Sequence, residues 1–390
     1  MALAAGLILC TLAAAYAAAV AATATGLRRI LDAPARAGDL PAISVVVAAR
    51  NEETAIEECL EAILSNDYPP ERFQLIVVDD GSDDATHEIL SGIARERGGR
   101  KPELLVLRTS GRGAGKGGAL ESGILAATGD IVVTTDADCS VSNGWLRALA
   151  GSFTDDTGFV AGPVVNRDGG GLWRRIEALE FLALVGFGAG SIGLGSPTIC
   201  NSANAAYPRR LFLEWRDHGH PGHLPASDEL VMHYVHTQTP YGVAFTARHE
   251  AVVETAGASS VAHFWRQRSR WASSIPHFPP GVRRLSAIFY AFFAALVAAL
   301  VASLFEPWLL VPAAVALGVK AVSDAAIVVP LCRHVGREHL LRVFPATEML
   351  HVPYILVAAL IGMFRPTRWK GRRVNARAAP TPGVAESRAA

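Results

Sequence analysis

Long uncharged runs at both ends of the chain constrain its fold more than any other feature. Residues 2–25 carry no charged side chain, and three further apolar runs lie toward the C-terminus, at about 285–304, 307–331 and 343–364. A bilayer is spanned by about 20 apolar residues, and the backbone inside it must be helical or part of a closed barrel. We therefore predict an N-terminal transmembrane anchor, 1–26, and C-terminal transmembrane or re-entrant helices, 285–365.

Basic residues after the first run predict its orientation. Arg28, Arg29 and Arg36 follow directly, and positive charge favours the cytoplasmic side. A cleaved signal peptide is the alternative, but a basic segment before the apolar run is missing and the run is long. We favour an integral protein of a bacterial inner or plasma membrane, with its central part in the cytoplasm.

The number of C-terminal crossings stays open at this point. The loop after the second run is basic, and so is the start of the tail, 366–390, which is expected to be disordered further on. Three full crossings would place that basic tail outside, against the charge rule. Either the third run is re-entrant or interfacial, or the second is irregular, where Lys320 and Asp324 can pair one helical turn apart.

Charge and cysteine content exclude several classes of function. The chain has 36 basic and 36 acidic residues, so no overall positive field attracts nucleic acid. Its five cysteines are scattered and contain no C-x-x-C pair. This argues against a disulfide framework or a zinc site and fits a reducing compartment.

The middle of the chain, 40–280, has the pattern of an α/β domain. Short β-branched runs alternate with segments of helical periodicity: strands at 43–49, 73–80, 103–109 and 130–138, and helices at 52–66, 83–97 and 115–128. Continuous apolar strands alternating with helices predict a mostly parallel, Rossmann-like sheet covered on both faces. Ligands of such sheets bind at the carboxyl ends of the strands.

Polar residues gather where those strands end. The first strand is followed by Arg50 and Glu52, the second ends at Asp80, and the fourth ends at Asp136 and Asp138. Each group alone is explained by helix capping or a turn, but three on one sheet edge indicate a site. Mg²⁺ takes one or two carboxylates and completes its shell with phosphate oxygens and water. One carboxylate of the D-x-D pair can therefore bind a cation that carries a diphosphate, while the other accepts hydrogen bonds from a ribose or base.

Several motifs together resemble the membrane-associated family-2 glycosyltransferases, which have a GT-A fold. They are "VVVAARNEE", "LIVVDDGSDDAT", "GKGGALESGILAATGDIVVTTDAD" and "QRSRW", and the resemblance covers about 43–275. It implies that Asp138 holds Mg²⁺ or Mn²⁺ and that Asp80 takes the base or ribose of a nucleotide-sugar. The implied donor-binding residues are Ala48, Arg50, Glu52, Asp80, Lys116 and Asp136.

The second half of the resemblance implies the acceptor site and the catalytic base. Asn204 lies in the segment that lines the sugar and acceptor site, although an Asn-rich turn before a helix is a serious alternative. The base is expected in the acidic pair Asp228–Glu229, written here in the order opposite to the family's usual one. We favour Asp228, which directly follows the potential cap Ser227, although capping and the helix dipole alone also explain both charges.

Gln267, Arg268, Arg270 and Trp271 match the family's Q-x-x-R-W element. Arg270 can bind a diphosphate through two N–H groups, and Trp271 can stack on the acceptor. The alternative is a basic, aromatic helix that only anchors the domain to lipid headgroups. Both roles are compatible.

These observations predict an inverting glycosyltransferase that moves a sugar from a UDP- or GDP-linked donor to a lipid-linked or membrane-embedded acceptor. A processive polysaccharide synthase is the alternative within the class, and a non-catalytic nucleotide-sugar-binding membrane protein is the alternative from another class. A dinucleotide oxidoreductase is excluded, because "AARNEE" stands where G-x-G-x-x-G would follow the first strand. Sugar, base, acceptor and oligomeric state stay open.

Overall fold

The computed structural model describes residues 2–34, 39–109, 115–167, 169–218, 227–364, 368–369 and 372–373. The chain divides into two compact units. One is built from apolar helices and comprises 1–32, 166–199 and 257–365. The other contains the β-sheet and comprises 33–165, 200–256 and 366–390. The stretch 40–280, predicted as one catalytic domain, thus contributes two segments to the helical unit.

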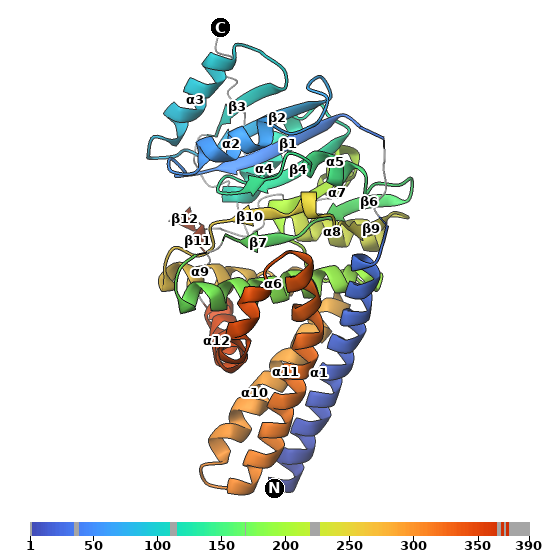
Figure 1. The fold of residues 1–390 in the computed structure, drawn as a ribbon, viewed down its shortest axis with the longest axis vertical. Helices are drawn as coiled ribbons and strands as arrows, with labels where there is room; N and C mark the ends of the chain where they lie inside the picture. The colour runs from blue at the N-terminus through green and yellow to red at the C-terminus, as the bar shows by residue number, and fades with distance from the viewer. Residues whose placement is uncertain are drawn as a thin grey trace. The chain divides into compact units, whose positions relative to one another are not determined.

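The sheet unit is built on a seven-stranded sheet of order β3-β2-β1-β4-β8-β6-β9 (Figure 1). Its first four strands are parallel neighbours, β8 is antiparallel to both β4 and β6, and β6 is parallel to β9. The mostly parallel sheet is therefore confirmed. The strands are β1 Ile43–Ala49, β2 Phe73–Asp79, β3 Glu103–Arg108, β4 Ile131–Asp136, β6 Thr157–Ala161, β8 Ala205–Pro208 and β9 Gly242–Phe245.

Helices alternate with the first strands as the periodicity predicted. Each predicted strand and helix of 43–138 is found, with ends that differ by a few residues. The helices of this unit are α2 Ile56–Leu64, α3 Thr86–Arg97, α4 Gly115–Ala126, α5 Trp145–Ala150, α7 Arg209–Asp217 and α8 Ser227–Gln238. A second, three-stranded sheet has the order β5-β10-β7, with β5 Ser140–Val141, β10 Val253–Thr255 and β7 Val164–Asn166.

The central strands owe their position to their composition. Every residue of β1 and β2 is buried, as expected for valine-rich strands covered on both faces. Helix α4 approaches them closely through Gly123, where a Cβ atom would lie 2.5 Å from Val46 Cγ1 and 3.1 Å from Val78 Cγ2. Because α4 follows β3 and precedes the parallel strand β4, its first turn lies at the carboxyl ends of the strands.

The helical unit contains five helices long and apolar enough to cross a membrane, counted within the described residues. Each of the five overlaps one long helix: α1 Ala2–Leu31, α6 Leu172–Gly193, α10 Pro280–Ala302, α11 Leu310–His334 or α12 Phe344–Phe364. Helices α1, α10 and α11 run alongside one another, whereas α6 crosses one end of this bundle together with α9, Val261–Ala272 (Figure 1). Within its most apolar stretch, α6 is 78% buried, so protein rather than solvent or lipid surrounds most of it.

Glycines allow α1 and α6 to cross in backbone contact. A Cβ atom on Gly26 would lie 2.1 Å from the carbonyl oxygen of Gly190, and one on Gly190 would lie 2.3 Å from that of Thr23. Neither backbone can move aside without moving its helix, so small residues are required here.

A buried polar cluster joins three of the long helices. Lys320 Nζ donates to Asp324 Oδ2 at 2.8 Å and to Glu348 Oε2 at 2.7 Å, and the Tyr16 hydroxyl donates to Asp324 Oδ1 at 2.6 Å. The predicted pairing of Lys320 with Asp324 is confirmed. Glu348 and Tyr16 were not anticipated, because they come from α12 and α1, far away in the sequence.

Candidate functional site

The carboxyl ends of the central strands meet at one edge, as predicted. In the sheet register, Ala48 of β1 lies opposite Asp136 of β4, and Ala49 lies opposite Asp79 of β2. The candidate residues at this edge therefore come together from three separate stretches of sequence.

Lys116 and Asp136 form the centre of this edge. Lys116, in the first turn of α4, makes an ion pair with Asp136 and donates from Nζ to Ser202 Oγ at 2.7 Å. The backbone of Ser202 is fixed in turn, since its carbonyl oxygen accepts from Thr134 Oγ1 of β4 at 2.9 Å. Residues 110–114, which precede α4 in the Gly-rich segment, lie outside the described residues.

Asp138 lies just past β4, beside Thr255 and Cys139. Its Oδ2 accepts from Thr255 Oγ1 of β10 at 3.3 Å, and its Oδ1 lies 3.9 Å from Cys139 Sγ. The described residues contain no group of three or more His, Cys, Asp or Glu that would enclose a metal ion. Two carboxylates, from Asp136 and Asp138, nevertheless fit Mg²⁺ or Mn²⁺, because such ions take most of their ligands from phosphate and water.

Asp228 is a buried carboxylate on α8. Its side chain is 3% exposed, and Oδ1 accepts from the Tyr207 hydroxyl at 3.1 Å. Oδ2 has no hydrogen-bond partner within the described part of the chain. Burial raises the pKa of Asp228 to about 6, against the attraction of Lys116 and the Tyr207 hydrogen bond, and Asp136 raises the pKa further.

Tyr207, which donates to Asp228, lies in β8, the neighbour of the strand β4 that ends at Asp136, and Lys116 and Asp136 both influence the pKa of Asp228. A carboxyl with a pKa of about 6 is mostly ionised at neutral pH yet remains an effective proton acceptor. Glu229, the next residue, is only half-buried. The side chain of Ser227, expected to cap this helix, lies outside the described residues.

The loop after β2 is held by the residues predicted to bind the donor. Asp80 is fully buried and accepts from Thr109 Oγ1 at 2.8 Å. Arg50, 5% exposed, donates to the carbonyl oxygens of Asp80 at 2.7 Å and Gly81 at 3.1 Å. The Glu52 backbone N–H donates to Thr86 Oγ1 at 2.8 Å. Arg50 thus shapes the loop, since its NH1 group is engaged with backbone.

The side chain of Asn204 is bonded within the protein. It is fully buried, and its Nδ2 donates to the carbonyl oxygens of Pro163 at 2.9 Å and Ala251 at 2.7 Å. Its Oδ1 accepts from Trp145 Nε1 at 3.0 Å. With both N–H bonds of the amide used, Asn204 holds in place the segment that carries Ser202, and its predicted role at the sugar and acceptor site stays a prediction.

Three residues of the site were missed at the sequence level. Tyr207, Thr255 and the Ser202 hydroxyl contact Asp228, Asp138 and Lys116, respectively. Tyr207 lies in the antiparallel strand β8, which is too short to be predicted from an apolar run. Only the topology brings it beside α8.

The Q-x-x-R-W residues belong to α9 and to the helical unit. Arg268, 3% exposed, forms an ion pair with Glu180 of α6 and lies over the rings of Phe264 and Trp271, 4.7 and 4.4 Å from their centroids. Gln267 Oε1 accepts from Arg268 NH1 at 2.6 Å. Arg268 is therefore engaged inside the unit, whereas Arg270 is half-buried.

Comparison with known protein families gives two adjacent matches. Residues 44–215 match the family described as Glycosyl transferase family 2, and residues 226–381 match Glycosyl transferase family 21. The first match contains the strand-end residues, and the second contains Asp228 and α9.

Two curated relatives illustrate the likeness in sequence. The beta-monoglucosyldiacylglycerol synthase of Synechocystis sp. is 28% identical over 239 residues, which are 60% of this chain and 47% of that protein. The poly-beta-1,6-N-acetyl-D-glucosamine synthase of Staphylococcus epidermidis is 23% identical over 232 residues, 59% of this chain and 53% of that protein. The chain thus spans about half the length of these curated relatives.

A solved structure shares the fold. The mannosyltransferase PcManGT from Pyrobaculum calidifontis, solved in complex with GDP-Man and Mn²⁺, gives a TM-score of 0.61 at 23% sequence identity. The match covers 92% of this chain and 99% of that one. At this identity the likeness shows the fold, and it confirms the predicted GT-A architecture.

Proposed function

Because this chain is a family-2 glycosyltransferase with a GT-A fold, we propose that it transfers one sugar, with inversion, from a UDP- or GDP-linked donor to a membrane lipid. The observation that carries this proposal is the buried Asp228, with one oxygen unpartnered among the described residues and Lys116 and Asp136 in electrostatic reach.

The donor would lie along the edge where β1, β2 and β4 end. Asp80 would take the base or ribose, on a loop that Arg50 holds in shape, beside Ala48 and Glu52. Asp136 and Asp138 would hold Mg²⁺ or Mn²⁺, which when bound neutralises charge on the departing diphosphate. Lys116 would bring a second positive charge to the diphosphate oxygens. It would also fix the orientation of Asp136.

Asp228 would act as the general base. As the acceptor hydroxyl attacks the anomeric carbon, its proton passes to Asp228 Oδ2, and the bond from that carbon to the diphosphate oxygen breaks on the opposite face. Oδ1 stays bonded to the Tyr207 hydroxyl throughout, which holds the carboxylate in place. Glu229 is the alternative base. Gln267, Arg270 and Trp271 of α9 would contribute to diphosphate and acceptor binding.

A membrane acceptor agrees with the apolar helices. Arg28 and Arg29 occupy the last turn of α1, which supports a cytoplasmic sheet unit. Helices α10 and α11 would exit and return, and α12, which packs on α6 and α9 through contacts such as Tyr354 with Phe264, would lie at the interface. This arrangement would give α10 and α11 as full crossings and would keep the basic tail in the cytoplasm.

The second candidate is a processive polysaccharide synthase, which the likeness to a poly-beta-1,6-N-acetyl-D-glucosamine synthase favours. Its product would be a ladder of chain lengths, whereas a single-transfer enzyme gives one product. The size distribution of the labelled product distinguishes a processive synthase from a single-transfer enzyme.

The test is donor consumption by the detergent-solubilised full chain. UDP- and GDP-sugars are offered singly with Mn²⁺ or Mg²⁺ and total membrane lipid, to the natural protein and to Asp138→Ala, Asp228→Asn and the exposed control Asp156→Asn. We expect one donor to be consumed with metal, one labelled lipid to appear, and only the first two variants to abolish it. Nucleotide binding without consumption of any donor would instead support the non-catalytic reading.

A further inference from the structure

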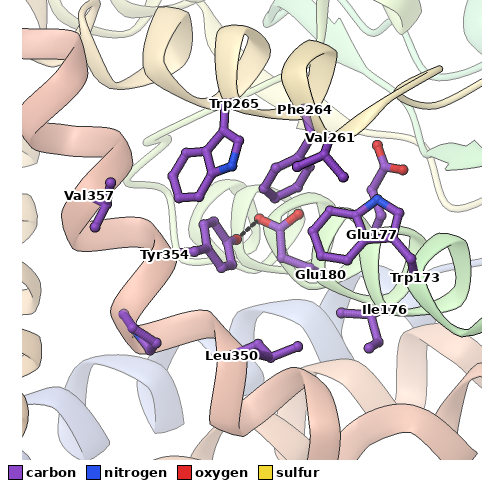
Figure 2. Close-up of a pocket in the computed structure, with 11 residues that line it drawn as sticks. Trp173, Ile176, Glu177, Glu180, Val261, Phe264, Trp265, Leu350, Tyr354 and Val357 are labelled. Carbon is purple, nitrogen blue, oxygen red and sulfur yellow. Dashed lines mark hydrogen bonds between the residues drawn. The ribbon is translucent and has the colours of Figure 1, made fainter.

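A cavity of about 370 Å³ lies within the helical unit, between α6, α9 and α12. Its walls include Ile176 of α6, Phe264 and Trp265 of α9, and Leu350 and Tyr354 of α12 (Figure 2). Ligand pockets commonly enclose about 300–1,000 Å³. A cavity at the lower end of this range suits one hydrocarbon chain with a small polar end.

The charged residues of the lining are both acidic. Nine of the 11 lining residues are apolar or aromatic, and the other two are Glu177 and Glu180. Among the described residues, no basic side chain belongs to the lining, and the nearby Arg268 is already paired with Glu180. A phosphate placed in the cavity would therefore meet carboxylates and no unpaired lining cation.

The two glutamates differ in what they can still bind. Both oxygens of Glu180 are engaged. One forms an ion pair with Arg268, and the other accepts from the Tyr354 hydroxyl, as Figure 2 shows. Glu177 accepts through Oε1 from the backbone N–H of Ala258 at 2.8 Å. A carboxylate has about four acceptor positions and no hydrogen to donate. Glu177 therefore suits a ligand that donates a hydrogen bond, such as a hydroxyl, and opposes one that only accepts.

The mouth of the cavity is apolar. Val261, Leu350 and Val357 are 54%, 45% and 44% exposed, although they are large hydrophobic residues. Leu350 and Val357 lie on α12, which has the length and composition of a membrane segment, and Val261 lies on α9. Such a rim is stable when it faces hydrocarbon, so the natural source of an occupant is the bilayer.

We propose that this pocket binds one chain of an uncharged lipid alcohol, with the lipid hydroxyl donating to Glu177. That this lipid is the sugar acceptor rests on the proposed function, whereas its binding does not. The lining excludes lipids whose head group is an anionic phosphate, because burying an unpaired charge is unfavourable.

The test uses two photoactivatable lipids with the same acyl chains, a diacylglycerol and a phosphatidic acid, each with a diazirine in one chain. The full-length protein in phosphatidylcholine nanodiscs is labelled without any nucleotide-sugar, and the labelled peptides are identified by mass spectrometry. We expect peptides of α6, α9 and α12 to carry the diacylglycerol in about tenfold excess over the phosphatidic acid. This excess corresponds to a difference of about 1.4 kcal/mol in binding free energy.

Three variants test the assignment. Val357→Trp fills the mouth and should remove most of this labelling, whereas Val322→Trp, on the 76% exposed face of α11, should leave it unchanged. Glu177→Gln keeps the acceptor for Ala258 but removes the charge, and should raise labelling by phosphatidic acid. Equal labelling by both lipids, or labelling that Val357→Trp does not reduce, would overturn the proposal.

Failure of this proposal is distinguishable from failure of the proposed function. Labelling is measured without donor and is repeated in Asp228→Asn, so it does not depend on transfer. A labelled pocket in a protein that consumes no donor leaves the pocket assigned and removes the transferase role. Sugar transfer with labels only elsewhere leaves the enzyme and removes the pocket.

Discussion

Both compact units bury charged side chains, but they hold them differently. In the helical unit, Glu180 is bonded through both oxygens to Arg268 and Tyr354, and Asp324 is bonded through both to Lys320 and Tyr16. In the sheet unit, Asp228 is equally buried, yet Oδ2 has no hydrogen-bond partner among the described residues. The first arrangement uses the charges to join helices, and the second leaves an acceptor open.

This difference separates structural from reactive carboxylates more clearly than burial does. Asp79 belongs to the sheet unit and is fully buried, and its Oδ1 accepts from Ser82. Its Oδ2 also has no hydrogen bond among the described residues, but it lies at ion-pair distance, 3.2 Å, from both His87 and Arg108. It resembles Glu180 rather than Asp228. An open oxygen on a buried acid is unfavourable for folding, so its presence points to chemistry.

The same substitution at both kinds of site should have opposite effects. Asp228→Asn removes the base and should lower kcat by about 10²–10⁴-fold while the protein stays folded. Glu180→Gln leaves the buried Arg268 without its counter-charge and should lower the free energy of unfolding by about 3–5 kcal/mol. Donor turnover and thermal unfolding in detergent are measured for both variants.

The contrast fails if Asp228→Asn unfolds the protein or if Glu180→Gln leaves the unfolding midpoint unchanged. The first outcome would make Asp228 structural, and the second would mean that Arg268 finds another partner. Glu121→Gln, in an exposed ion pair with Arg216, is the control, since surface pairs contribute about 0–1 kcal/mol.

Removing the cation of the polar cluster is the next largest change. Lys320→Met leaves the buried Glu348 and the half-buried Asp324 without their shared partner, and we expect about 3 kcal/mol of destabilisation or more. Lys101→Met is the matched control, because Lys101 pairs with Glu103 on the surface at 3.4 Å. Comparable unfolding midpoints for both lysine variants would show that the cluster contributes little to stability.

The glycine crossing should be sensitive to a single methyl group. Gly26→Ala places a Cβ atom 2.1 Å from a backbone oxygen of α6, and overpacking of this kind costs about 1–3 kcal/mol. Gly318→Ala in α11 meets nothing within 4 Å and should be neutral or slightly stabilising, because alanine favours the helix. If the two variants unfold alike, α1 and α6 do not pack as described.

The sequence predicted those features that depend on local periodicity. The strands of the first half, their shared edge and the apolar helices follow from alternation, run length and charge. The pairing of Lys320 with Asp324 follows from helical spacing, because four residues bring two side chains to one face.

Other features depend on long-range packing and could not be predicted in this way. Glu348 joins Lys320 across 28 residues, and Tyr207 reaches Asp228 from an antiparallel strand across the sheet. Asn204 and Arg268 were assigned to substrate from motif position, yet their side chains are engaged with the protein itself. A motif identifies which residue types recur, whereas hydrogen-bond partners decide what each one can still bind.

The smallest effect concerns the pH dependence of Asp228. Its pKa is raised to about 6 from the ordinary value of 3.8, so the folded state binds a proton that the unfolded state releases between these values. Stability of the natural protein therefore falls as pH rises from about 4 to 6 and stays reduced above it, by at most about 3 kcal/mol.

Asp228→Asn lacks this titration, so its unfolding midpoint should exceed that of the natural protein at pH 8 and approach it near pH 4. The net gain should be a few degrees at most, because the buried amide must find an acceptor for its N–H bonds. Transfer by the natural protein should also decline as pH falls through about 6, where the base becomes protonated. A stability difference independent of pH would mean that Asp228 titrates like an exposed carboxyl, and the open oxygen would then be solvated rather than held for the acceptor.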